Sequence, residues 1–128
     1  MLVAVNLIIL NEKNQIYLAK RSGKEDVESG KWGVPGGSVE QNESLEEAIR
    51  REYKEETNCE IIELDFFKSR YLNSTLAVYF YGKIKGQIKL NEENTEYKWF
   101  SEEEIEKLEL AFNQNGILKE FFSTVEIL

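Results

Sequence analysis

The chain contains no histidine and a single cysteine, Cys59. Without an imidazole, Ser-His-Asp catalysis, Cys-His catalysis and histidine-ligated zinc are all excluded. One cysteine permits neither an intramolecular disulfide nor a thiolate metal cage. Any chemistry must therefore rely on carboxylates, lysine, arginine, tyrosine, hydroxyl groups or a hard cation held by oxygen atoms.

Basic side chains are scarce, since 16 lysines and arginines stand against 24 aspartates and glutamates, for a formal net charge of −8. Nucleic acids and anionic membranes bind through basic patches, so this balance disfavours both as partners. A phosphorylated substrate would also be repelled, unless a metal ion or a local group of lysine and arginine reversed the field.

Long apolar runs are missing as well. Residues 2–10 are apolar but too short to span a bilayer, and they contain Asn6 and lack a basic leader. We therefore expect a cytoplasmic protein. The length of 128 residues, with 41% hydrophobic content, suits one domain, to which we assign residues 1–128.

The pattern of apolar and turn-forming residues predicts a β-rich chain with a central and a C-terminal helix. Expected strands occupy residues 2–10, 15–20, 59–71, 75–85 and 96–100, and expected helices occupy residues 44–57, a stretch after Ser101 and residues 113–122. Residues 21–31 should form a loop and residues 32–37 a glycine-rich turn. This order predicts an α+β fold with a mixed sheet between helices.

The helix expected at residues 44–57 carries acids on an unexpected face. Ser44 is a candidate N-cap, and Glu47 would complete a capping box with it. A helical wheel places four apolar residues on one stripe: Leu45, Ala48, Ile49 and Tyr53. Glu52 and Glu56 fall on that same stripe, with Glu55 at its edge.

Carboxylates at this spacing repel one another, and the cost rises when they are buried without a positive partner. A divalent cation suits such a group of hard oxygen atoms better than a lysine does. The alternative is that this end of the helix is simply exposed and acid-rich, as in many acidic proteins.

The turn at residues 32–37, Trp-Gly-Val-Pro-Gly-Gly, lies just before this helix and holds the only proline of the chain. Glycine lets the backbone approach a neighbour closely, so amides and carbonyls of the turn can reach a ligand at the same end of the sheet. A glycine turn followed by a helix that gathers carboxylates is the layout expected for a metal-bridged phosphate.

These residues resemble the signature of the Nudix hydrolases, G-X5-E-X7-R-E-U-X-E-E-X-G-U, where U is bulky and aliphatic. Gly37, Glu43 and the run from Arg51 to Cys59 match it, and the preceding Trp-Gly-Val-Pro-Gly is also typical of the family. Three positions depart from the pattern, Asn58 for glycine and Tyr53 and Cys59 at aliphatic positions. The element order likewise resembles the Nudix α/β/α sandwich, with a mixed, mainly antiparallel sheet between helices.

The resemblance implies hydrolysis of a nucleoside diphosphate linked to another group, with Mg²⁺ or Mn²⁺ required. By position, Glu52, Glu55, Glu56 and the backbone carbonyl of Gly36 would be the metal ligands. Arg51 would orient an acid of this group. Glu43 would support the junction of loop and helix, or ligate a second metal through water. The proton of the attacking water would pass to Glu52 or to an acid from a distant loop.

The resemblance also suggests that distant acid. Many family members carry a functional glutamate just before a Trp-containing strand, and Glu96, in Glu-Tyr-Lys-Trp-Phe, occupies a similar place. Glu92 and Glu93 are competing candidates, and all three are alternatively solvated loop acids.

The substrate contacts suggested by the resemblance are Arg21 for phosphate, alone or with Lys20, Lys24 or Lys31, the Gly37 backbone, and Asn113 for the edge of a purine. Arg21 is alternatively a solvated loop residue, and Asn113 is equally well explained as a helix N-cap. Four aromatic residues are candidates for sandwiching a base, among which the sequence does not choose: Phe66, Phe67, Tyr79 and Tyr81.

No proline follows Pro35, and the proline and tyrosine patterns of other Nudix subclasses are missing. This favours a MutT-like enzyme that converts a standard or oxidised nucleoside triphosphate to monophosphate and pyrophosphate, as a monomer or homodimer. The alternatives are an ADP-ribose or nucleotide-sugar pyrophosphatase, a non-catalytic nucleotide-binding domain, and a purely structural acidic domain.

Overall fold

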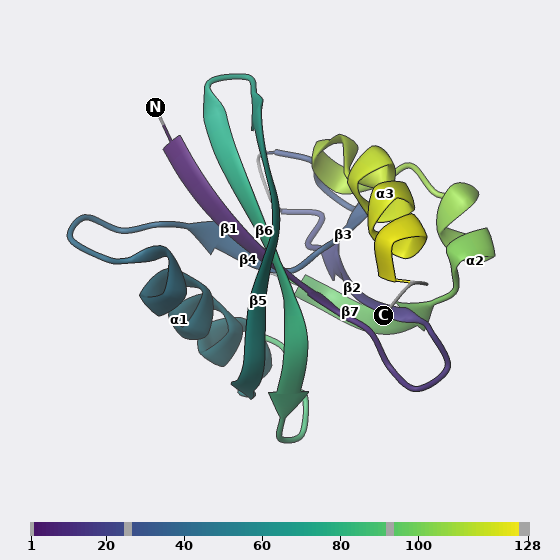
Figure 1. Cartoon of the computed structure of the whole chain (residues 1–128), viewed down its shortest axis with the longest axis horizontal. Coiled ribbons are helices and arrows are strands. Elements are labelled where there is room, and N and C mark those ends of the chain that lie inside the picture. Colours follow the sequence, from purple (N-terminus) through teal and green to yellow (C-terminus); the bar gives the residue numbers. More distant parts are fainter. Residues whose placement is uncertain (1, 25–26, 92–93, 126–128) are drawn as a thin grey trace.

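A computed structural model describes residues 2–24, 27–91 and 94–125 of the chain. Its elements, in chain order, are β1 (Leu2–Ile9), β2 (Ile16–Arg21), β3 (Trp32–Gly33), β4 (Gly36–Ser38), α1 (Leu45–Thr57), β5 (Glu60–Leu72), β6 (Thr75–Lys85), β7 (Asn94–Phe100), α2 (Glu102–Glu106), the 3₁₀ turn η1 (Ala111–Asn113) and α3 (Asn115–Val125). Helix α1 lies on one side of the strands and α2 and α3 lie on the other (Figure 1). The predicted sheet between helices is confirmed.

The strands form two sheets, of order β4-β1-β6-β5 and β3-β2-β7. β1 and β6 pair in parallel and the other pairs are antiparallel, as expected for a mixed, mainly antiparallel arrangement. The prediction of a plain turn at residues 32–37 is wrong, because its two ends pair as β3 and β4. Short glycine-containing strands carry almost no alternating pattern, so the sequence shows no sign of them.

Buried side chains form two cores on opposite faces of β1. Val5, Leu7 and Ile9 pack into the cluster that contains Ile49 of α1. Ile8 belongs to the other cluster, which includes residues of α3. This alternation follows from the two-residue period of a strand. It leaves α1 seated on one face of the first sheet.

Helix α1 has the ends that its sequence predicts. The Ser44 side chain accepts a hydrogen bond from the Glu47 amide, and Glu47 returns one to Ser44, so the capping box is complete. Asn58 ends the helix in the left-handed conformation, with φ of 62°. Asparagine tolerates this conformation, so it replaces the glycine of the Nudix signature without distortion.

The face that α1 buries includes the two acids singled out by the wheel. Glu52 is 9% exposed and Glu56 is 4% exposed, beside Ala48, Ile49 and Tyr53. The placement of Leu45 on the buried stripe is wrong, since this side chain is 40% exposed. A wheel gives the direction of a side chain, and the extent of the sheet beneath it decides whether that direction is covered.

The C-terminal helix begins later than predicted. α3 starts at Asn115, and Asn113 belongs to the preceding turn η1 with φ of 53°. Asn113 is therefore not the N-cap of this helix, because an N-cap residue adopts extended dihedrals next to the first helical residue. Asn115 does bond the chain locally, since its side chain accepts from the Leu110 amide. No helix among the described residues is long and apolar enough to cross a membrane.

Replacement of Tyr53 by phenylalanine tests how α1 is held on the sheet. The buried Tyr53 hydroxyl donates to the Leu7 carbonyl of β1 at 2.9 Å. Its loss should lower the free energy of unfolding by roughly 0.5–1.5 kcal/mol, the usual net value of such a hydrogen bond. The measurement is urea denaturation, with the exposed Tyr71→Phe as control. Equal stability of Tyr53→Phe and the control variant would contradict this role.

Candidate active site

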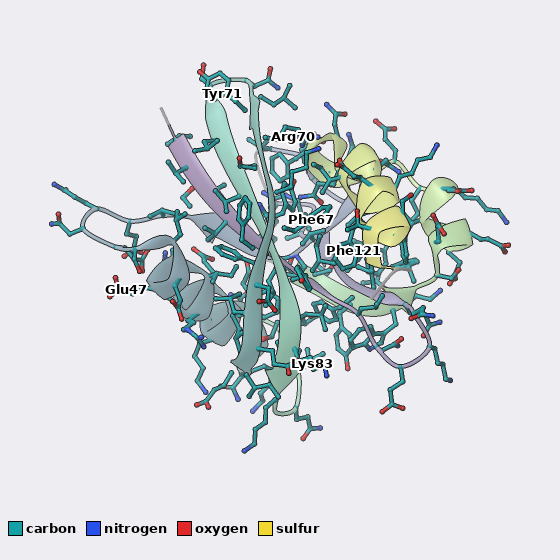
Figure 2. The ribbon with its side chains drawn as sticks, in the orientation of Figure 1. Glu47, Phe67, Arg70, Tyr71, Lys83 and Phe121 are labelled. Atoms are coloured by element: carbon teal, nitrogen blue, oxygen red, sulfur yellow. The ribbon has the colours of Figure 1, made fainter. Side chains whose placement is uncertain are left out.

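A cavity of about 760 Å³ opens at the end of β1 where the glycine-rich segment (residues 32–37) passes. Its lining includes Glu52 and Glu56 of α1, together with Arg21, Arg70 and residues of η1. The volume lies within the range of small-molecule sites. Glu47, by contrast, lies on the outer side of α1, away from the sheet (Figure 2).

The glycines of the segment are required by close approaches. A side chain at Gly36 would place its Cβ 1.9 Å from the Val5 carbonyl oxygen of β1. A Cβ at Gly37 would lie 2.3 Å from the Glu52 carboxylate carbon. The predicted close approach is thus confirmed, and the Glu52 carboxylate lies directly against the backbone of Gly37.

Arg51 joins the loop before α1 to the acids of the helix. Its guanidinium donates to both carboxylate oxygens of Glu43, at 2.7 and 2.9 Å, and to the Ser38 carbonyl at 3.0 Å. It also donates to Glu52 at 2.9 Å and to Glu55 at 3.4 Å. Two-pronged charge-assisted bonds of this kind fix geometry strongly. The arrangement matches the orienting role suggested for Arg51 and the supporting role suggested for Glu43.

The same contacts keep both Arg51 and Glu43 charged. Hydrogen bonds from Arg51, and then from the Glu40 amide, lower the pKa of Glu43 from 4.5 to about 2. The hydrogen bonds that Arg51 donates to Glu43 and Glu52 raise the pKa of Arg51 above its already high ordinary value. The guanidinium therefore stays protonated, and Glu43 stays ionised, throughout the neutral range.

The donors at this site suit a hard divalent cation. Glu52 supplies carboxylate oxygens next to the backbone of Gly37, and Glu56 and Gly36 line the same cavity. Within residues 2–24, 27–91 and 94–125, no three acidic, cysteine or histidine side chains converge as a finished metal cage. Glu52 and Glu55 instead share Arg51, and the Glu55 side chain is 54% exposed. A cation bound here would draw on oxygens that Arg51 now orients.

The predicted distant acid lies elsewhere in the fold. Glu96 is on β7, where it pairs with Lys20 of β2 at 3.5 Å, and it does not line the cavity. Glu92 and Glu93 lie outside the described residues. The role of Glu96 as a base stays a prediction.

Arg21 and Asn113 both line the cavity. Arg21 donates through Nε to the Val27 carbonyl at 3.0 Å, and its guanidinium lies 5.1 Å from the centre of the Phe112 ring. The Asn113 carbonyl accepts from Arg70 at 3.0 Å. Both residues are therefore placed to contact a ligand in the cavity.

The structure separates the four aromatic candidates. Tyr79 lines the cavity, whereas Phe67 and Tyr81 pack on Phe121 of α3 in the core. Figure 2 shows Phe67 and Phe121 side by side between β5 and α3. Phe66 is 60% exposed on β5 and does not line the cavity.

Two cavity residues, Arg70 and Phe112, were not predicted from the sequence. Phe112 directly precedes Asn113, and an aromatic residue next to a suspected contact is a signal that could have found it. Arg70 lies on β5 and bonds to η1, 42 residues away along the chain. Nothing in the local pattern indicates that contact.

The charge on Glu43 should make the fold sensitive to acid. Because its pKa falls from 4.5 to about 2 on folding, its stabilising effect is complete above pH 4.5 and disappears as pH falls toward 2. Glu43→Gln should therefore be less stable than the parent at pH 7, with a difference that shrinks below pH 4.5. Urea midpoints between pH 7 and pH 2 measure this, and a difference independent of pH would contradict it. Glu46→Gln, which removes an exposed pair with Arg50, is the control.

Known proteins resemble the chain over most of its length. The family model described as NUDIX domain matches residues 1–121. An 8-oxo-dGTP diphosphatase of Buchnera aphidicola is 34% identical, covering 76% of this chain and 74% of that protein. An ADP-ribose pyrophosphatase of Methanocaldococcus jannaschii is 31% identical, covering 88% and 69%.

Solved structures agree with this assignment. The crystal structure of a MutT protein from Methanosarcina mazei Go1 superposes with a TM-score of 0.84 at 32% identity, over 96% of this chain and 94% of that one. Its fold is the one predicted here from the resemblance. With the match over residues 1–121, these similarities show that the chain belongs to the Nudix family, as a hydrolase of phosphoric anhydrides.

Proposed function

We propose that the chain is a Mg²⁺-dependent pyrophosphohydrolase of nucleoside diphosphate-X compounds, with a standard or oxidised nucleoside triphosphate as substrate. The observation that carries this proposal is the pair of buried carboxylates, Glu52 and Glu56, against the glycine-rich segment in a cavity of about 760 Å³. Relatives named 8-oxo-dGTP diphosphatase and nucleoside triphosphatase NudI support the substrate class. The products would be nucleoside monophosphate and pyrophosphate.

Glu52, Glu55, Glu56 and the Gly36 carbonyl would hold the cation, Mg²⁺ or Mn²⁺. Nudix hydrolases generally use divalent metals, which neutralise a diphosphate and lower the pKa of bound water. Arg51 keeps the Glu52 carboxylate turned toward Gly37, and Glu43 anchors Arg51.

The reaction itself needs one bond made and one broken. Water adds its oxygen to a phosphorus of the anhydride, and the bond from that phosphorus to the bridging oxygen breaks. Pyrophosphate leaves if the α-phosphorus is attacked, and nucleoside monophosphate leaves if the β-phosphorus is attacked. The proton of the water passes to a carboxylate, since the chain has no histidine. Glu52 lies in the cavity and Glu96 does not, so the geometry of the described residues favours Glu52.

The cavity also carries positive charge that would offset the repulsion between a phosphorylated substrate and a protein of net charge −8. Arg21 and Arg70 bring two guanidinium groups to the lining of the same cavity. A cation at the glutamates and these arginines would together reverse the local field that a phosphorylated substrate meets. Asn113 and the Gly37 backbone complete the proposed substrate contacts.

A second candidate is an ADP-ribose or nucleotide-sugar pyrophosphatase. The relative from Methanocaldococcus jannaschii, named ADP-ribose pyrophosphatase, favours it. The missing proline after Pro35 favours the triphosphate instead. A non-catalytic nucleotide-binding domain would bind nucleotides with no turnover.

We further propose one domain over residues 1–128, present in the cytoplasm as a monomer or homodimer. Neither nucleic acid nor a membrane is expected as partner, given the excess of acidic residues.

A nucleotide screen tests the proposed reaction. Purified protein with Mg²⁺ should release pyrophosphate from at least one standard or oxidised nucleoside triphosphate, with the monophosphate identified by chromatography. Release of adenosine monophosphate and ribose phosphate from ADP-ribose, with no triphosphate cleaved, would favour the second candidate. Folded protein that hydrolyses no compound would contradict both.

Substitution of a buried glutamate tests the proposed carboxylate ligands. Glu56→Gln keeps the shape but removes a charge beside the proposed cation, and kcat should fall on the order of 10²–10³-fold, as when one electrostatic contact to a transition state is lost. The control is Glu46→Gln, an exposed acid of the same helix, which should keep the parent rate. Equal rates in the parent and Glu56→Gln would exclude the role of Glu56.

Alanine substitutions at Gly36 and Gly37 separate an effect on stability from an effect on hydrolysis. In Gly37→Ala the new methyl meets the far end of the Glu52 side chain and not backbone, so the fold should survive while hydrolysis falls. In Gly36→Ala the methyl meets the backbone of Val5, so thermal stability itself should fall. Full activity in folded Gly37→Ala would contradict the placement of Glu52.

A further inference from the structure

The turn η1 brings a strained aromatic residue, Phe112, to the lining of the cavity. Phe112 and Asn113 are consecutive residues with φ of 53° each. This left-handed conformation is costly for a residue with a side chain, and for a bulky one it is a clear outlier. The surrounding structure must therefore hold the turn in place.

Contacts from two other segments hold it. Arg70 of β5 donates to the Phe112 carbonyl at 2.6 Å and to the Asn113 carbonyl at 3.0 Å. Glu28 accepts from the Phe112 amide at 3.2 Å and is itself bound by Lys31 at 2.7 Å. The Phe112 amide and the carbonyls of Phe112 and Asn113 are thus each bonded to a charged side chain, and these bonds fix the position of the turn.

The turn is also joined to the glycine-rich segment. The Gln114 side chain, which is 1% exposed, accepts from the Val34 amide at 2.8 Å. A Cβ at Gly33 would lie 3.2 Å from the Ala111 Cβ, so β3 and η1 are in close contact. The position of Phe112 is therefore set relative to the segment that carries Gly36.

The Phe112 ring is available to a ligand. It lines the cavity and is 41% exposed, and the Arg21 guanidinium lies over it at 5.1 Å from its centre. Val27 and Leu72, both exposed, line the same cavity. The Phe112 ring therefore offers the cavity an exposed aromatic surface with a cation against it.

We propose that Phe112, supported by Arg21, is the stacking surface for the base of the nucleotide, and that it restricts substrates to compounds that carry an aromatic base. The inference rests on the proposed function, because the phosphates must lie at the glutamates for the base to reach Phe112. Aromatic stacking of a base contributes roughly 5- to 150-fold in affinity, whichever base is stacked.

Binding, measured without turnover, tests this proposal. Calorimetry with Mg²⁺ compares α,β-methylene nucleoside triphosphates of the four bases with the base-free ribose 5-(α,β-methylene)triphosphate. The parent should bind at least one nucleotide on the order of tenfold more tightly than the base-free compound. Phe112→Leu should lose most of this preference without weaker binding of the base-free compound, and Phe112→Tyr should restore it. Phe66→Leu, an exposed phenylalanine outside the cavity, is the matched control and should keep the parent preference.

The outcomes separate this inference from the proposed function. A parent that binds both kinds of compound equally, or neither, overturns the stacking role, as does a Phe112→Leu variant that keeps the full preference. Thermal unfolding of each variant shows whether it is folded, and an equal loss for nucleotide and base-free compound would mark a purely structural effect and overturn the role too. Failure of the proposed function is recognised separately, as absence of hydrolysis in a parent that still prefers the nucleotide.

Discussion

The site depends on one close contact, the Glu52 carboxylate lying against the backbone of Gly37. A carboxylate in this position is 9% exposed, and it is tolerable there because Arg51 donates to it at 2.9 Å. The same guanidinium grips Glu43 in the loop that leads into α1, so loop, helix and glycine-rich segment share a single charged junction. Replacing any partner in that junction changes the surroundings of the others.

The lining of the cavity combines two chemically different groups of residues. Oxygen donors come from α1 and the glycine-rich segment, and guanidinium groups with the Phe112 ring come from β2, β5 and η1. A molecule that carries both phosphates and a flat ring matches both groups. This combination makes it possible for an acidic protein to bind an acidic substrate, because the unfavourable overall charge is overcome locally.

Much of the site could be predicted from the sequence, because its parts are close along the chain. Arg51 meets Glu43 across eight residues and Glu55 across a single helical turn, so spacing alone brings them together once α1 forms. The burial of Glu52 and Glu56 follows in the same way from their shared stripe with Ile49. Leu45 shows the limit of this reasoning, because its exposure depends on where the sheet beneath the helix ends.

The sequence by itself determined the capped helix, the close approach of the glycines and the grouping of the acids, since all three follow from the spacing of neighbouring residues. Only the tertiary structure decided which distant residues complete the cavity, where Arg70 of β5 bonds to η1 across 42 residues. It also decided that Glu96 pairs with Lys20 and does not line the cavity, and that Phe112 does line it. These contacts follow from the pairing of strands and from how loops meet across the sheets, and no local period encodes which distant segments will face each other.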